Sequence, residues 1–265
     1  MIRKFESSDK QIIEQAAKKD IYQNVYFYID SQAYGYDGEN IKTVLVERDG
    51  EIRAVLYTYY TSLQFFALNE LNYKELSEVS EYILQNRFKM VSGKYEIIEK
   101  ICSAMPDIYH KTKGFLMSGE NCVSSYSGRT KWACPQQCDE IAELICSDKE
   151  IGGHYSVEEL SDQLKDRMLN RGCRNLIITD GEKIISHMAS YAEKNEIAVL
   201  GGLITHLDYR HDGLGRIVLM DLAKSFIDEN RLPVLFVFDE TLVNWYEGNG
   251  WEKMSECGKM ELINV

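Results

Sequence analysis

The feature that most constrains the fold is a pattern that occurs twice, about 130 residues apart. Near the N-terminus a short apolar strand leads to Asp9, and a run with apolar residues at helical spacing follows it. A similar step from strand to helix surrounds Asp139, 130 positions later. An Asp-Gly turn divides two apolar runs at residues 49–50 and again, 131 positions later, at residues 180–181, and such turns are typical of hairpins. Two features at nearly one offset predict a duplicated unit.

Each half is predicted to continue through the same elements. Periodicity places a strand at residues 63–68 and a helix at 74–85 in the first half, and a strand at 196–206 and a helix at 214–229 in the second. Each half should then end with a strand, a short helix and a final hairpin. The second half holds about eight extra residues at the corner between its strand and its helix. This order of elements indicates a mixed α/β (α+β) fold with two related domains.

The acidic composition narrows the range of partners. The chain has 265 residues and a formal net charge of -12, whereas a nucleic-acid binder usually has a basic face. Its apolar runs are much shorter than the roughly 20 residues that span a bilayer, and its start lacks a signal-peptide pattern. Seven scattered cysteines do not indicate a disulfide framework. We therefore expect a cytoplasmic protein without a nucleic-acid or membrane partner.

The chemistry is concentrated where the strand of the second half meets its helix. A turn with two glycines, Gly213 and Gly215, opens an amphipathic helix there. Such a turn presents unsatisfied backbone N–H groups at the positive end of a helix dipole, and glycine lets an anion come close to the backbone. Arg210 and Arg216 add positive charge. The segment matches neither the P-loop pattern nor the Gly-x-Gly-x-x-Gly pattern, so it predicts a phosphate site of another kind.

This segment resembles the pyrophosphate-binding motif of the GNAT superfamily of N-acetyltransferases. The motif, Arg/Gln-x-x-Gly-x-Gly/Ala, is matched at Arg210, Gly213 and Gly215. A second family element, Tyr-x-x-x-Gly-Phe, is similar to residues 246–251, where Trp251 replaces the Phe. The apolar strand before that element follows the order of the family.

The resemblance spans residues 129–265 and implies an acetyl-CoA-binding catalytic domain there. Residues 1–128 look like a degenerate copy, because their corner at 69–73 contains no glycine. The implied fold is two tandem GNAT-like domains, each a mixed, mostly antiparallel sheet flanked by helices. The implied activity is transfer of an acetyl group from acetyl-CoA to a primary amine of a small molecule or a peptide, without a metal.

The resemblance also implies roles for individual residues. The pantetheine arm would pair with the backbone of Leu203, Ile204 and Thr205, and the pyrophosphate would lie on a loop and helix start formed by Arg210, His211, Asp212, Gly213, Leu214, Gly215 and Arg216. Tyr246 matches the general acid of the family in position. A tyrosine with its ordinary pKa near 10 keeps its proton at neutral pH and can donate it.

The general base and the acceptor stay open. Many family members carry a Glu on the fourth strand, but residues 201–205 contain no acid, which leaves Glu196, His206 or a water chain as alternatives. Asp239 stands where the family often has an Asn. The alternative function is a non-catalytic acyl-CoA-binding or regulatory protein on the same fold. Neither the acceptor nor the oligomeric state can be read from the sequence.

Other reactive side chains are expected to be structural. Cys134, Cys138 and Cys146 lack the tight pairing of a zinc site, so they are expected to be buried thiols and no metal ligand set is predicted. His187 lies in an apolar strand and is expected to be a packed residue.

Overall fold

Contacts within the structure divide the chain into two compact units. The computed structural model describes residues 1–122, 125–149, 151–152 and 155–263. The first unit contains Met1–Leu116, Val237–Val243 and Met254–Val265, and the second contains Met117–Phe236 and Asn244–Lys253. The predicted division between residues 128 and 129 differs from this one, because the end of the chain belongs to the first unit.

The first unit is built around one sheet. Its strands are β1 (Ile2–Lys4), β2 (Asp37–Gly38), β3 (Ile41–Arg48), β4 (Glu51–Tyr59), β5 (Ser62–Ala67), β6 (Met90–Lys94) and most of β7 (Tyr109–Ser118) and β13 (Glu252–Leu262). Their order is β1, β3, β4, β5, β6, β13 and β7, with β2 beside β3. The pairs β1–β3, β3–β4, β4–β5 and β6–β13 are antiparallel, and β5–β6 is parallel.

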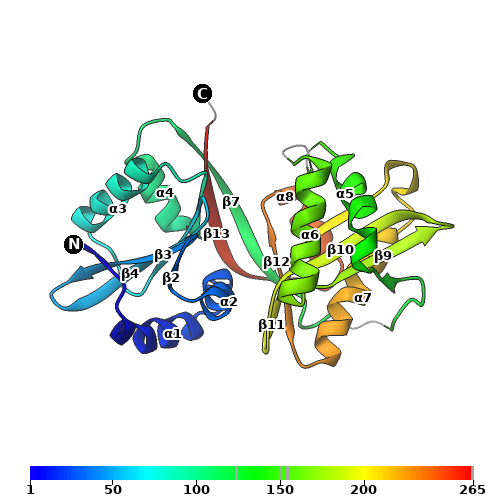
Figure 1. Ribbon diagram of the computed structural model, residues 1–265, viewed down its shortest axis with the longest axis horizontal. Coiled ribbons are helices and arrows are strands. Elements are labelled where there is room, and N and C mark those ends of the chain that lie inside the picture. Colours follow the sequence, from blue (N-terminus) through cyan, green and yellow to red (C-terminus); the bar gives the residue numbers. More distant parts are fainter. Residues whose placement is uncertain (123–124, 150, 153–154, 264–265) are drawn as a thin grey trace. The chain divides into compact units, whose positions relative to one another are not determined.

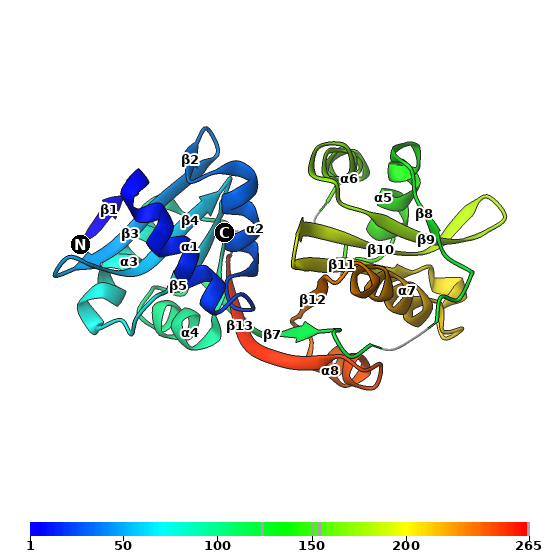
Figure 2. The ribbon, with the colours of Figure 1, turned by 90° about the horizontal axis from the view of Figure 1, so that it is seen from below.

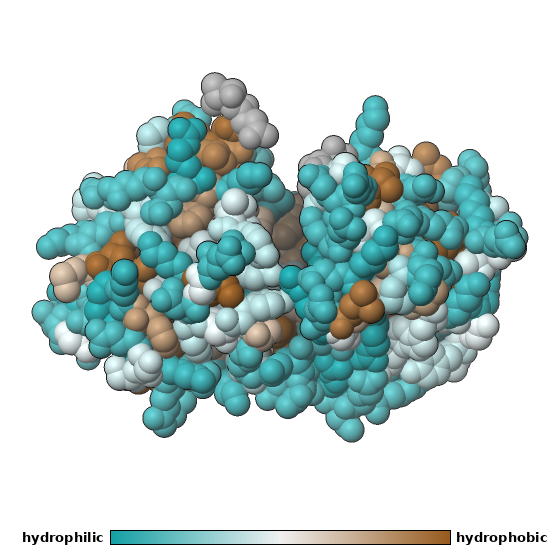
Figure 3. Space-filling view, viewed as in Figure 1, coloured by the Kyte–Doolittle hydropathy of each residue, from teal (hydrophilic) through white to brown (hydrophobic). Residues whose placement is uncertain are grey.

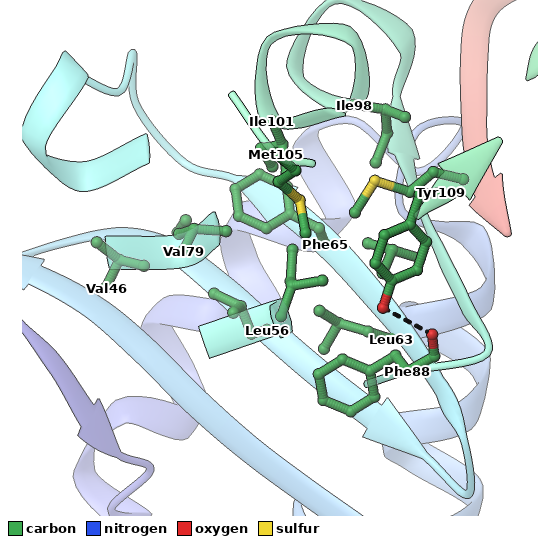
Figure 4. Close-up of a cluster of buried hydrophobic side chains, with 14 of the residues drawn as sticks. Val46, Leu56, Leu63, Phe65, Val79, Phe88, Ile98, Ile101, Met105 and Tyr109 are labelled. Carbon is green, nitrogen blue, oxygen red and sulfur yellow. Dashed lines mark hydrogen bonds between the residues drawn. The ribbon is translucent and has the colours of Figure 1, made fainter. Parts of the chain in front are cut away.

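Helices cover both faces of this sheet (Figures 1 and 2). They are η1 (Ser7–Asp9), α1 (Lys10–Lys19) and α2 (Val25–Tyr34) on one face, and α3 (Tyr73–Asn86) and α4 (Tyr95–Ser103) on the other. Because both faces are covered, the consecutive residues Val44, Leu45 and Val46 of β3 are all buried. On the α3 and α4 face, the Tyr109 hydroxyl donates a hydrogen bond of 2.9 Å to the Phe88 carbonyl inside an apolar cluster (Figure 4).

The second unit has the same kind of architecture. Its strands are β8 (Lys131–Trp132), β9 (Asn175–Asp180), β10 (Lys183–Lys194), β11 (Ile197–Thr205) and β12 (Leu232–Val237), in the order β12, β11, β10, β9, β8. Among the described pairs of these five strands, β11–β12 is parallel and the others are antiparallel. Figure 2 shows α5 (Cys138–Cys146) and α6 (Val157–Arg171) on one face and α7 (Leu214–Asp228) on the other. The short helices η2 (Pro135–Gln137) and η3 (Leu207–Tyr209) also belong to this unit, and α8 (Glu240–Glu247) enters it at Asn244. The predicted mixed, mostly antiparallel sheet flanked by helices is therefore confirmed.

Both predicted hairpins are present. In the first, Arg48 pairs with Glu51, and the two turn residues Asp49 and Gly50 have φ of 53° and 79°, which matches the twist of a two-residue hairpin. In the second, Asp180 pairs with Lys183 and Gly181 has φ of 57°, so the turn lies one residue later than the Asp-Gly pair suggests.

The hairpin predicted at the end of each half is wrong. A single strand, β7, follows α4, and a single strand, β13, follows α8. In the first unit β13 lies between β6 and β7, and Cys257 to Glu261 pair with Lys94 to Met90. A strand edge needs a hydrogen-bonding partner. Here the partner comes from the far end of the chain, which no local pattern can indicate.

The surface is mostly hydrophilic on the face seen in Figure 3, where apolar side chains are exposed singly or in small groups. Within the described residues, no helix has both the length and the apolar character needed to cross a membrane.

Candidate functional site

The candidate site begins where β11 separates from β12. The two strands pair in parallel only from Ile197 with Leu232 to Leu200 with Leu235. β11 continues to Thr205, and its other edge stays paired with β10 as far as Ser186. Along one edge, residues 201–205 therefore have no paired residue of β12 in the described chain. Such an edge can accept an extended ligand in the manner of an added strand.

A bulge lies at the start of this open segment. Two residues of β11, Gly202 and Leu203, oppose one residue of β10, and Gly202 has φ of 66°. The left-handed conformation suits glycine because a side chain would collide with the following carbonyl. The bulge turns the strand and its open edge away from the regular ladder.

A buried histidine holds this bulge. His187 is fully buried, with Nδ1 at 3.0 Å from the Gly202 carbonyl and Nε2 at 2.8 Å from the Asn175 amide. Burial lowers the pKa of His187 to about 4, so the ring is neutral at pH 7. The Gly202 carbonyl can only accept, so Nδ1 carries the ring proton and donates to it, while Nε2 lies against the Asn175 Oδ1 atom. The residue is packed as predicted, and it also links β9, β10 and β11.

An aromatic ring covers the glycines of β11. A Cβ atom on Gly201 or Gly202 would lie 2.6 or 2.5 Å from atoms of the Tyr191 side chain. Burial raises the pKa of Tyr191, so its hydroxyl keeps its proton. The guanidinium of Arg167 lies 4.6 Å from the centre of that ring. A side chain at Gly201 or Gly202 would therefore have to displace the Tyr191 ring.

The loop after β11 is held by Arg210. Its Nε donates to the Thr205 carbonyl at 3.0 Å, and its Nη2 donates to Asp148 at 2.6 Å. The guanidinium therefore ties the loop to the end of the strand, and a carboxylate already balances its charge. The sequence pattern could not distinguish this structural use of Arg210 from direct contact with a phosphate.

The start of α7 offers free backbone donors. His211 and Gly213 have φ of 71° and 75°, and Gly213 is the N-cap with no side chain capping the helix. The first turn bond runs from Ile217 N–H to the Gly213 carbonyl. Among the described residues, no acceptor pairs with the backbone N–H groups of Leu214, Gly215 and Arg216. These donors, at the positive end of a 15-residue helix, fit an anion such as a pyrophosphate.

Arg216 links this helix start to the segment after α8. It is exposed, and its Nε donates to the Asn249 side chain at 2.6 Å, whereas no ion pair with a carboxylate is recorded for it in the described part of the chain. Asn249 in turn donates to the Trp245 carbonyl at 2.7 Å. Unlike Arg210, Arg216 therefore keeps a positive charge that can face an anion. Asn249, three residues after Tyr246, was not singled out by the sequence, because its role depends on a contact with a distant helix.

Tyr246 is an almost buried residue of α8. Its side chain is 8% exposed and packs edge-on against Trp245 and Trp251. Burial raises its pKa to about 12, so it is protonated at neutral pH. The large Trp251 fits because residue 119 is glycine: a Cβ atom there would lie 2.9 Å from the indole ring. The replacement of Phe by Trp is thus compensated within the second unit.

The other candidate residues lie away from the open segment or do other work. Glu196 comes just before β11, at the end of the strand opposite the loop. An extended strand rises about 3.3 Å per residue, which puts Glu196 roughly 16 Å from Gly201. His206 accepts a hydrogen bond from the Asp208 N–H group, at 3.3 Å, and contacts Lys183. Asp239 caps its own helix by accepting from the N–H and hydroxyl of Thr241 at 2.8 and 2.7 Å.

The expectation of three buried thiols is only partly right. Cys138 is buried, Cys146 is half-buried and Cys134 is exposed. Cys134 precedes the short helix η2 instead of lying on the inner face of α5, which explains its exposure. Among the residues that the structure describes, no cluster of three His, Cys, Asp or Glu side chains could hold a metal ion.

Comparisons with known proteins show the fold. A GCN5-related N-acetyltransferase from Sphaerobacter thermophilus is 13% identical, with a TM-score of 0.64 over 100% of this chain and 96% of its own. A GNAT-family acetyltransferase from Colwellia psychrerythraea is 12% identical, with a TM-score of 0.60 over 99% and 100% of the two chains. A tandem GNAT protein from the clavulanic acid biosynthesis pathway is 10% identical, with a TM-score of 0.58 over 100% and 99%. At these identities the likeness concerns structure alone. The whole chain therefore has the fold of the GNAT acetyltransferases.

By sequence, no protein-family model and no curated protein matches this chain.

Proposed function

We propose that the protein is an N-acetyltransferase that moves an acetyl group from acetyl-CoA to a primary amine of a small molecule or a peptide. The observation that carries this proposal is the combination at the end of β11: a strand edge that opens from β12, followed at once by an uncapped helix start with free backbone donors. One feature suits an extended arm and the other suits a pyrophosphate.

The residues present fit acetyl-CoA in two segments. Backbone groups of Leu203, Ile204 and Thr205 would pair with the pantetheine arm along the open edge. The N–H groups of the first turn of α7 would hold the pyrophosphate, while Arg216 adds an unpaired positive charge. Arg210 would act indirectly, by holding the loop in place. When bound, acetyl-CoA supplies the activated acyl group.

The side chains support proton donation more clearly than proton removal. Tyr246 keeps its proton at neutral pH, so it can serve as the general acid for the leaving thiolate. β11 carries no acid beside Gly201 and Gly202, and the ring of Tyr191 covers that position. We therefore propose that the amine reaches the site already neutral or loses its proton to water.

The first unit has no equivalent anion site in this proposal. The N-terminus of α3 is closed by a capping box: Asn72 accepts from the Glu75 N–H at 2.9 Å, and Glu75 accepts from the Asn72 N–H at 2.7 Å. A carboxylate already occupies the place where a phosphate would have to lie. We expect one acetyl-CoA per chain.

The test pairs two glycines with the same backbone conformation. Gly213 and Gly172 have φ of 75° and 66°, and nothing lies within 4 Å of a Cβ atom on either. Alanine at each position should therefore cost a similar roughly 1–2 kcal/mol of strain. Only Gly213→Ala should weaken acetyl-CoA binding in calorimetry, by about tenfold or more, because its methyl group lies at the anion site.

The outcome separates the two functions on this fold. Equal acetyl-CoA affinity in wild type and Gly213→Ala would remove the anion site from α7. Binding without thiol release against a panel of amines would instead favour the non-catalytic acyl-CoA-binding or regulatory alternative, which the missing acid on β11 supports. A stoichiometry of two would overturn the assignment of a single site.

A further inference from the structure

The first unit contains a hollow that the acetyl-transfer site does not use. It has a volume of about 250 Å³ and lies between the ends of β3, β4 and α3. Its walls are formed by Lys42, Thr58, Tyr60, Thr61, Tyr82, Asn86, Arg87 and Phe88. A second hollow of about 370 Å³ adjoins it and shares Lys42, Thr58 and Tyr60. An apolar cavity of about 150 Å³ can hold a benzene ring, so the first hollow has room for a ring and one polar group.

The lining of this hollow is positively charged in an acidic protein. Lys42 and Arg87 contribute two cations, and no Asp or Glu belongs to the lining, although the chain has a net charge of -12. Neither cation forms a recorded ion pair with the residues that the structure describes. The acids Asp37 and Glu39 line only the second hollow. An anion would therefore be bound in the first hollow, between the two cations.

Two tyrosines provide flat walls beside these charges. Lys42 Nζ lies 5.7 Å from the centre of the Tyr82 ring, and Tyr60 is 60% exposed at the surface. Burial raises the pKa of Tyr82, so its hydroxyl keeps its proton and can donate. Aromatic walls of this kind favour a planar ring, because offset or edge-on ring pairs add roughly 0.5–1.5 kcal/mol beyond burial.

A pair of hydroxyl groups lies in the same lining. Thr58 is 9% exposed, and its hydroxyl lies within hydrogen-bonding range of the Tyr82 hydroxyl. Each hydroxyl has one donor and two acceptor sites, so this pair keeps hydrogen-bonding capacity for a polar group of a ligand in the hollow.

The backbone holds this lining in an unusual conformation. Tyr60 and Arg87 have φ of 52° and 49°, and both are among the few non-glycine residues in the left-handed region. Their N–H groups bond to the carbonyls of Asn40 and Ile83 at 2.8 and 2.9 Å. The floor is fixed by Phe88, whose carbonyl accepts from Tyr109 (Figure 4). The pocket is thus preformed, with strained residues at its wall as at many ligand sites.

From these features we propose that the first unit binds a small planar aromatic anion, with the ring between Tyr60 and Tyr82 and the charged group on Lys42 and Arg87. The anionic group is a carboxylate or a phosphate. This site is independent of the acetyl-transfer site and gives the unit without the glycine motif a ligand of its own.

The probes are benzoate, phenyl phosphate and cyclohexanecarboxylate, titrated into the full chain and followed by two-dimensional NMR. Benzoate, phenyl phosphate or both should bind, and whichever binds more tightly identifies the anionic group. Cyclohexanecarboxylate, which has the charge but no planar ring, should bind at least fivefold more weakly than benzoate. No binding of either aromatic probe, or equal binding of the cyclohexane compound, would overturn the proposal.

Three variants test the location. Arg87→Gly removes the cation and relieves a left-handed conformation, so it should weaken binding about tenfold or more without destabilising the fold. Lys42→Met should have a similar effect on binding. Lys18→Met is the matched control, because Lys18 also lies 5.7 Å from a tyrosine ring, that of Tyr28, and it should leave binding unchanged.

The acetyl-CoA site provides the last control. Binding of the aromatic probe should persist in Gly213→Ala, and acetyl-CoA affinity should persist in Arg87→Gly. Probe binding that is unchanged by Arg87→Gly and Lys42→Met, or that is lost in Gly213→Ala, would show that the ligand binds elsewhere.

Discussion

The two strand-to-helix corners, β5 to α3 and β11 to α7, share their place in the fold but differ in chemistry. In α3 the N-cap is Asn72 and the third helical residue is Glu75, and their side chains satisfy the first backbone donors. In α7 the same two positions are Gly213 and Arg216, and the donors stay free. One pair of residues closes a helix start, whereas the other opens it to an anion.

The strands before these corners differ in the same sense. β5 and β6 pair through Gln64 with Ser92, and Gly93 still lies so close that a Cβ atom on it would be 2.5 Å from the Phe65 carbonyl. β11 leaves β12 after Leu200, while five more residues of β11 follow. At the second corner the strand edge and the helix start are both open, and at the first corner both are closed, which is the difference that the proposed acetyl-CoA site requires.

The largest expected effect tests whether acetyl transfer depends on a residue of the second half alone. Tyr246→Phe should lower turnover by roughly 10²–10⁴ while acetyl-CoA affinity changes little, because a general acid contributes about that much. Steady-state kinetics and calorimetry measure the two quantities. Tyr95→Phe is the control, since Tyr95 is on α4, the helix of the first unit that corresponds to α8 in element order. Wild-type turnover in Tyr246→Phe would exclude the role.

The next effect concerns the histidine that holds the bulge. Folding lowers the pKa of His187 from 6.5 to about 4. Between pH 4 and pH 6.5 the unfolded chain therefore binds more protons than the folded protein. Stability is then fully present above pH 6.5 and is lost as the pH falls towards 4, by roughly 3 kcal/mol in total. Denaturant unfolding at several pH values measures this loss.

A variant assigns that loss to the histidine. The first half has Leu56 seven positions after Asp49, as His187 lies seven positions after Asp180. His187→Leu should therefore reduce the slope of stability against pH in this window, as well as weaken acetyl-CoA binding through the bulge at Gly202. An unchanged slope would mean that other groups cause the acid sensitivity.

A charge reversal makes the second corner resemble the first. Arg216→Glu puts a carboxylate at the third residue of α7, where α3 has Glu75. Acetyl-CoA affinity should fall about 10²-fold, since hydrogen bonds to charged groups contribute roughly 1.5–3 kcal/mol. The helix itself should be slightly more stable, because an acid suits its N-terminus. Calorimetry measures the expected loss of affinity, and thermal unfolding measures the expected gain of stability. Undiminished affinity would exclude Arg216 from the site.

The smallest effect is expected when the start of α3 loses its cap, which should not create an acetyl-CoA site there. Asn72→Ala removes the N-cap of α3 and should cost about 1 kcal/mol of stability, a typical value for such caps. The acetyl-CoA stoichiometry should stay at one, because β5 and β6 remain close at Gly93. Appearance of a second binding event would show that capping alone separates the two halves.

Much of this comparison can be read locally. The bounds of α3 and α7 agree with the predicted helices within one residue, because amphipathic spacing and turn residues are properties of adjacent positions. The same holds for the hairpins at Asp49 and Asp180. The glycine turn also predicted unsatisfied N–H groups at the start of a helix, and Gly213 is indeed an N-cap without a capping side chain.

The sequence by itself thus determined the two Asp-Gly hairpins, the helices α3 and α7 and the turn at Gly213, since each depends on residues close in the chain. Only the tertiary structure decided that β13 joins the first unit, that β11 parts from β12, that Asp148 neutralises Arg210 and that His187 holds Gly202. The reason is physical: these contacts join residues far apart in the chain, and their partners are selected by burial and by the need to satisfy every polar group, which no local pattern records.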